Sequence, residues 1–195
     1  MRCNMPKSLQ STSKFLSLIL RHEPQAIGLT LDQHGWAELE TLIALVNANG
    51  TQISLALILE VVATSDKQRF VVSPDGKKIR ANQGHSVSID LNLPPQKPPV
   101  QLFHGTASRF VQSIRENGLV PGSRQHVHLS VIEATAIQVG SRHGNPVVLI
   151  VKSLEMHSDQ YDFFLSENGV WLTSNVPARY LVFPGEAVQP YTTVQ

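Results

Sequence analysis

The sequence has one cysteine, no long apolar run and almost no net charge. Cys3 alone cannot form an internal disulfide, and the longest apolar stretches, such as Leu55 to Ala63 and Pro146 to Val151, fall far short of the roughly 18 residues of a membrane helix. The first thirty residues lack a charged start followed by an apolar run and a cleavage site. With 16 basic and 15 acidic side chains, the chain has no global field that attracts nucleic acid. We therefore expect a cytoplasmic protein outside the membrane, in which local charge clusters bind any anion.

Several motifs that bind phosphates or metals are also missing. The sequence contains no Gly-x-Gly-x-x-Gly, no Gly-x-x-x-x-Gly-Lys-Ser/Thr, no Gly-x-Ser-x-Gly and no His-Glu-x-x-His. The only metal-like spacing, His126-x-His128, would place two imidazoles on one strand face, with no carboxylate or cysteine cluster nearby. We therefore expect no metal site.

A proline-rich segment divides the chain. Residues 89–99 carry four prolines in a short polar span, the composition of a semi-rigid extended linker. Because 42% of the residues are hydrophobic, each side has enough apolar material for its own core. The sequence predicts two domains, 1–92 and 93–195.

The first domain combines helical and strand patterns. Apolar residues at helical spacing predict three helices. These run from a Ser13 cap to Arg21 and His22, before Pro24, from Trp36 to Val46 with an end at Asn49 and Gly50, and from Ser54 to Val62. Two strand-like runs, 69–73 and 77–81, flank the turn residues 74–76 and predict a hairpin. Three helices followed by a hairpin are typical of a winged-helix-like domain.

The second domain alternates short strands and helices, which makes the whole chain α+β. We expect strands at 102–103, 127–129, 146–152, 170–173 and 179–183, and a helix that includes Phe110 and ends at Asn117 and Gly118. The run Ser130, Val131, Ile132, Glu133 predicts a capping box at the start of a further helix.

Arginines at the edges of these elements are the main chemical feature. Arg21 and His22 close the first helix, Arg69 opens the hairpin, and Arg124 precedes a strand. Guanidinium groups on separate elements can converge on one phosphate, because each offers a planar fork that matches two phosphate oxygens. For each arginine alone, a solvated charge at the end of an element is the favoured interpretation.

Eight strings favour the first interpretation. In order and spacing they resemble the NAD-dependent RNA 2′-phosphotransferase family, also called tRNA 2′-phosphotransferase, over roughly residues 12–185. The strings are SKFLSLILRHEP, LDQHGWAEL, VVATSDKQRF, IRANQGHS, FHGTASRF, GLVPGSRQHVHLS, ATAIQVGSRHG and ENGVWLTSNVP. The resemblance implies an N-terminal winged-helix-like lobe that handles the RNA 2′-phosphate and a C-terminal ADP-ribosyltransferase-like lobe that binds NAD.

The resemblance also implies a reaction. Such enzymes transfer the internal 2′-phosphate left at an RNA splice junction to NAD, which is consumed as a co-substrate. The reaction passes through an ADP-ribosylated 2′-phosphate and yields 2′-hydroxyl RNA, nicotinamide and ADP-ribose 1″,2″-cyclic phosphate. We expect a monomer whose partners are NAD and RNA that bears an internal 2′-phosphate.

Site residues carry over position by position. The family's phosphate-handling group falls on Arg21, His22, Arg69 and Arg124. Its NAD-site segments fall on His104, Gly105 and Thr106, on His128, Leu129 and Ser130, and on Gly169, Val170 and Trp171. We expect Trp171 to be a core residue, since a large aromatic side chain in a short apolar strand usually packs.

Other positions follow from their place in the chain. Gly84, His85 and Ser86 lie just before the linker and are expected to contact substrate. Lys77, Lys78 and Arg80 on the hairpin could guide the RNA backbone or form an ordinary solvated surface.

One departure from other ADP-ribosyltransferases concerns the acid. Val170 occupies the position of their catalytic glutamate, and Glu167 is expected in a turn. A phosphate dianion needs no carboxylate to activate it, and a nearby negative charge would repel it. We expect the arginines to stabilise the phosphoryl transition state, and His22 to protonate the departing 2′-oxygen or to bind phosphate.

Two other functions remain as alternatives. An NAD-dependent ADP-ribosyltransferase would stop after the first step and cap terminal phosphates of RNA or DNA. A non-enzymatic nucleic-acid binder is disfavoured, because the first domain has nine basic and eight acidic side chains.

Overall fold

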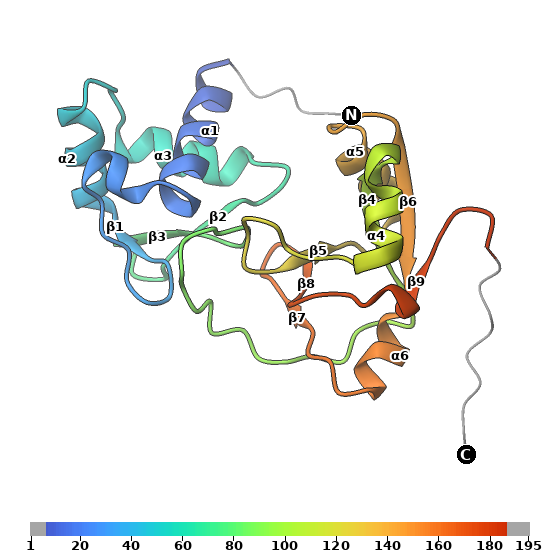
Figure 1. Ribbon diagram of the computed structural model, residues 1–195. Coiled ribbons are helices and arrows are strands. Elements are labelled where there is room, and N and C mark those ends of the chain that lie inside the picture. The colour runs from blue at the N-terminus through green and yellow to red at the C-terminus, as the bar shows by residue number, and fades with distance from the viewer. Residues whose placement is uncertain (1–6, 187–195) are drawn as a thin grey trace. The chain divides into compact units, whose positions relative to one another are not determined.

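The computed structural model describes residues 7–186, and its chain divides into two compact units, Met1–Asn92 and Leu93–Gln195 (Figure 1). Both units combine helices with small antiparallel sheets, so the α+β class is confirmed. Within the described residues no helix has the length and apolar character to span a membrane.

The first unit packs helices against one small sheet. In Figure 1, α1, α2 and α3 lie together beside β1, β2 and β3, and all of these elements contribute to one hydrophobic core. The elements are α1 (Lys7–Arg21), the 3-10 turn η1 (Pro24–Ile27), β1 (Ala37–Glu38), α2 (Leu39–Ala48), α3 (Leu55–Thr64), β2 (Phe70–Val72) and β3 (Lys78–Ala81). The sheet order is β1-β3-β2. This content agrees with the predicted helices and hairpin, and the winged-helix assignment stays a prediction.

Helix α1 ends as predicted and begins earlier. The backbone amides of His22 and Glu23 both donate to Leu18 O, at 2.9 and 3.0 Å, and Pro24 then opens η1. The predicted cap at Ser13 is wrong, because Ser13 is a buried residue inside the helix. The helix starts at Lys7, six residues before Ser13, because residues 7–12 contain no proline or glycine that would break it.

The second predicted helix also begins at the wrong residue. Backbone amides of His34 and Trp36 both donate to Asp32 Oδ1 at 2.9 Å, which closes a tight turn. The chain leaves this turn extended as β1, whose Ala37 pairs with Ile79 of β3. Trp36 therefore precedes a strand, and α2 starts only at Leu39.

The third helix and the hairpin match their predictions. Ser54 caps α3, since its Oγ accepts from Leu57 N at 3.2 Å. Strands β2 and β3 are antiparallel, with Phe70 opposite Ala81.

The second unit contains two three-stranded antiparallel sheets, with orders β4-β6-β9 and β5-β8-β7. A bridge between Phe103 and Ser130 connects the sheets, with N–O distances of 2.8 and 2.9 Å. The elements are β4 (Leu102–Ala107), η2 (Ser108–Phe110), α4 (Val111–Asn117), β5 (Val127–Leu129), α5 (Glu133–Gly140), β6 (Pro146–Val151), α6 (Ser153–Ser158), β7 (Phe164–Leu165), β8 (Trp171–Thr173), η3 (Ala178–Tyr180) and β9 (Leu181–Val182).

Two predictions in this unit need correction. The capping box is wrong: Ile132 precedes the first residue of α5, and Ser130 Oγ accepts from Ile132 N and donates to Ile132 O, both at 3.0 Å. The Ser130 hydroxyl is therefore hydrogen-bonded within a local turn that lies before α5, and it does not cap the helix. The strand predicted at 179–183 is shorter in the structure and consists of β9 alone, because the residues just before it form the 3-10 turn η3.

The proline-rich segment contains no helix and is anchored at both ends. In the first unit Asp90 N donates to Gln33 O at 2.8 Å, and in the second unit Gln96 N donates to Phe163 O at 2.7 Å. Each end of the segment is therefore fixed to its own unit.

Candidate functional site

In the first unit, the segment after β3 folds back onto the end of α1. Arg21 O accepts from Ser86 N at 2.9 Å and from Val87 N at 3.3 Å. The ring of His22 is hydrogen-bonded through Nδ1 to Ser86 Oγ at 3.0 Å. We call Arg21, His22, Arg69 and Gly84–Ser86 the α1-end cluster.

The start of β2 completes this cluster. Arg21 Nη2 donates to Arg69 O over 3.4 Å, and its guanidinium lies 5.9 Å from the centre of the Phe70 ring. Asn82 N donates to the same carbonyl at 2.9 Å, which fixes the backbone of Arg69. Residues separated by up to 65 positions in sequence thus lie at one point of the first unit.

Gly84 allows the close approach of the loop to Arg21. Its φ is +88°, a conformation that other residues adopt only with strain. A Cβ built on it would lie 3.7 Å from Arg21 Nη1, in ordinary contact with the guanidinium. The backbone at Gly84 therefore forms a wall of the cluster.

His85 is the most buried polar member of the cluster. Its exposed fraction is 2%, and neither ring nitrogen has a hydrogen-bond partner within the described residues. Burial, followed by the positive charges of Arg21, His22 and Arg80, lowers the pKa of His85 to about 3. The imidazole is therefore neutral at pH 7 and adds no charge beside Arg21.

In the second unit, two histidines are linked through β4 and β5. His104 Nδ1 donates to the carbonyl oxygen of His128 at 3.1 Å. Burial lowers the pKa of His104, so the ring is neutral and its Nε2 is an acceptor. This nitrogen can accept from a hydroxyl group such as that of a ribose.

Arg124 sets the proton position of His128. Its Nη1 lies 3.3 Å from His128 Nδ1, and because guanidinium only donates, Nδ1 must be the acceptor. A neutral His128 then carries its proton on Nε2. Burial, and secondly the positive charge of Arg142, lower the pKa of Arg124.

Helix α5 packs directly on β4 through two glycines. A Cβ at Gly105 would lie 1.8 Å from Ala136 O, and a Cβ at Gly140 would lie 2.5 Å from Thr106 O. Only glycine permits this approach, which holds α5 against the strand that carries His104.

Three predicted NAD-site residues have buried side chains. Thr106, Leu129 and Trp171 are at most 7% exposed, so the prediction that Trp171 is a core residue is confirmed. Thr106 and Leu129 could meet a ligand mainly through their backbone. Glu167 lies in the predicted turn, where Val170 N donates to Ser166 Oγ at 3.0 Å.

The hairpin cations form contacts of their own. Lys78 Nζ lies 3.7 Å from Asp32 Oδ2 and 3.3 Å from Glu38 Oε1, and Arg80 stacks 4.6 Å from the Trp36 ring centre. These contacts favour an ordinary surface over an RNA guide for Lys78 and Arg80. Sequence reasoning gave no sign of the stacking, because Trp36 was assigned to a helix.

No group of three or more metal-ligating side chains occurs between residues 7 and 186. His126 contacts Phe164 edge to face, with ring centres 6.0 Å apart, and burial lowers its pKa. His126 and His128 therefore have separate partners.

Comparison with known proteins agrees with the family suggested by the sequence. The family model described as RNA 2′-phosphotransferase, Tpt1 / KptA family, matches residues 7–175. A probable RNA 2′-phosphotransferase of Rhodopirellula baltica is 57% identical over 179 residues, which cover 91% of this chain and 97% of the relative. The proteins of the same description from Agrobacterium fabrum and Pseudomonas aeruginosa PAO1 are 55% and 53% identical, over 91% and 90% of this chain and 95% and 97% of their own lengths. The chain belongs to the RNA 2′-phosphotransferase family.

Proposed function

We propose that this chain is an NAD-dependent RNA 2′-phosphotransferase that removes an internal 2′-phosphate from RNA of the spliced-tRNA type. Family membership supports the phosphotransferase activity. The observation that carries the proposal further is the α1-end cluster, in which Arg21, His22 and the backbone of Arg69 meet at one point.

The cluster suits a phosphate group for electrostatic reasons. Arginine remains charged at every working pH and offers two parallel donors to a dianion. Because His85 is neutral, its ring places a polar group beside Arg21 without adding a positive charge that would repel the guanidinium. In the proposal, Arg21 and Arg69 of the first unit stabilise the negative charge that develops on the phosphoryl oxygens during transfer. His22, held by Ser86, protonates the departing 2′-oxygen.

The second unit provides the proposed NAD site. His104 Nε2 can accept from a ribose hydroxyl, and the Nε2–H of neutral His128 can donate to one. Gly105 lets α5 pack directly on β4, the strand that carries His104. Bound NAD would supply the ribose carbon that the RNA phosphate attacks, and these residues would hold that ribose in position.

A product assay tests the proposal. The protein is incubated with an oligoribonucleotide that bears one internal 2′-phosphate, with and without NAD, and the products are separated by chromatography. We expect NAD-dependent 2′-hydroxyl RNA, nicotinamide and ADP-ribose 1″,2″-cyclic phosphate. Loss of phosphate without NAD would overturn the NAD dependence.

The alternative is an ADP-ribosyltransferase that caps terminal phosphates. In that case oligonucleotides with a 5′- or 3′-phosphate would retain a stable ADP-ribosyl group, and no cyclic product would form. The same chromatogram separates the two reactions.

A further inference from the structure

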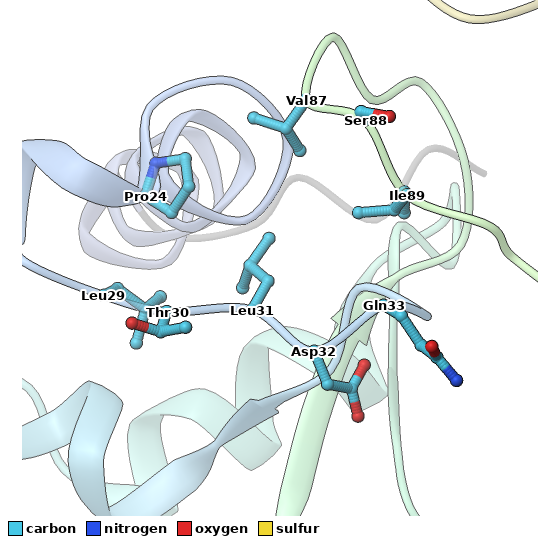
Figure 2. A pocket seen from close by; sticks show the side chains of 9 residues that line it. All are labelled: Pro24, Leu29, Thr30, Leu31, Asp32, Gln33, Val87, Ser88 and Ile89. Atoms are coloured by element: carbon cyan, nitrogen blue, oxygen red, sulfur yellow. The ribbon is translucent and has the colours of Figure 1, made fainter.

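Figure 2 shows a groove in the first unit. It lies next to the α1-end cluster, because the backbone amide of its lining residue Val87 donates to Arg21 O. One wall is the chain after η1, including Leu31, and the other is the segment from Val87 to Ile89. Its volume is about 320 Å³, at the lower end of the range of roughly 300–1,000 Å³ for small-molecule sites. It is therefore large enough for one flat ring system.

Both aliphatic and polar residues line this groove. In Figure 2 the side chains of Leu31, Val87 and Ile89 point into the groove, whereas Asp32 and Gln33 point out of it. Asp32 Oδ1 already accepts hydrogen bonds from two backbone amides, those of His34 and Trp36. The groove thus offers aliphatic side chains to the face of a ligand rather than a charge.

The walls are held in place without a ligand. Val87 N donates to Arg21 O, and Asp90 N donates to Gln33 O across the groove. The Ile89 side chain packs so tightly on the turn that a Cβ at Gly35 would lie 2.7 Å from Ile89 Cδ1. A pre-formed groove loses little entropy when a ligand binds.

The groove is continuous with the residues proposed to bind phosphate. Val87 follows Ser86, whose hydroxyl contacts His22, and Pro24 at the other end of the groove lies two residues after His22. A ligand that places a phosphate at His22 and carries a flat, largely apolar group would reach both. Single-stranded RNA has this combination, and proteins commonly recognise it through unstacked bases.

We propose that the groove binds a nucleobase of the RNA, either of the nucleotide that carries the 2′-phosphate or of its neighbour. This inference rests on the proposed function and adds a determinant of substrate choice. In this proposal the aliphatic side chains of Leu31, Val87 and Ile89 contact the face of the base.

The test compares a 2′-phosphorylated oligoribonucleotide with versions that are abasic at the phosphorylated nucleotide or at one neighbour. A base that stacks on an aromatic side chain gains about tenfold or more in affinity, and contact with aliphatic side chains alone should give a smaller gain. We expect one abasic substrate to have a KM roughly threefold to tenfold higher than the intact RNA. Val87→Trp, which fills the groove, should reduce that KM ratio to about one, whereas Leu59→Trp on the exposed face of α3 should retain it.

Ser88→Trp, at the exposed rim, provides a second variant if Val87→Trp does not fold. Equal KM values for intact and abasic RNA in the wild type, or an unchanged ratio in both tryptophan variants, would overturn the proposal. Fluorescence anisotropy with the same labelled RNAs measures Kd directly. If the wild type removes no phosphate, the proposed function fails, and the Kd ratio still decides whether the groove binds a base.

Discussion

The arginines at the ends of elements differ in their surroundings, and we propose that this difference separates a phosphate ligand from a surface charge. Arg21 lies against Gly84 and Phe70 beside the neutral His85, whereas Arg115 pairs with Glu186 at 2.7 Å. Charge alone does not distinguish them in the sequence. The neighbours that make the difference come from segments far along the chain.

Arg69→Ala should lower the single-turnover rate of 2′-phosphate removal by about 10²–10³, the effect of losing one preorganised donor to a transition-state charge. Arg109→Ala is the control, because Arg109 lies over the neighbouring Phe110 ring on the surface. A rate for Arg69→Ala equal to that of the control would exclude Arg69 from the chemistry.

His22→Ala should slow the second step more than the first, because the departing 2′-oxygen then lacks its proton donor. ADP-ribosylated RNA should accumulate and be visible by gel shift. If the variant instead stalls before nicotinamide release, His22 acts in the first step.

The burial of His85 predicts a pH dependence of stability. Its pKa falls from 6.5 to about 3 on folding, so between these values the unfolded chain binds a proton that the folded protein does not. The unfolding free energy of the wild type therefore declines as pH falls below about 6.5, by at most about 1.4 kcal/mol per pH unit from this group. His85→Leu removes this contribution. Urea unfolding at pH 7, 6 and 5 should show that the unfolding free energy of the variant rises relative to that of the wild type as the pH falls. Parallel dependences of the two free energies on pH would contradict a lowered pKa of His85.

At the level of elements, the pattern of apolar residues predicted most helices and strands because it reports which face is buried. It failed where side chains satisfy the backbone locally. Asp32 turns the chain ahead of β1, and Ser130 bonds to Ile132 instead of capping α5. Serine and aspartate occur both at helix caps and in turns, and the sequence alone does not show which of the two structures a given residue forms.

Gly105→Ala tests the contact of α5 with β4. The added methyl group would overlap the Ala136 backbone, so either the helix or the strand must move. We expect a loss of about 3 kcal/mol or more in unfolding free energy. Gly122→Ala is the matched control, since its φ of +65° adds strain with open space around it, and it should lose only about 1 kcal/mol. Equal losses in urea unfolding would show that α5 does not need this contact.

For the whole molecule, the near balance of 16 basic and 15 acidic residues makes local clusters responsible for anion binding. The sequence predicted Arg21, His22 and the 84–86 segment as site residues, and the structure brings them together within the first unit. The groove beside them left no trace in the sequence, because Leu31 and Val87 read as ordinary apolar residues. Assignment of RNA phosphate to the first unit and NAD to the second remains a prediction.

The most direct measurement follows the phosphorus atom. RNA that carries a ³²P-labelled internal 2′-phosphate is incubated with NAD and either the wild type or Arg69→Ala. The label should move from the RNA into ADP-ribose 1″,2″-cyclic phosphate with the wild type and remain on the RNA with the variant. Release of the label as inorganic phosphate, or transfer that is independent of NAD, would contradict the proposed reaction.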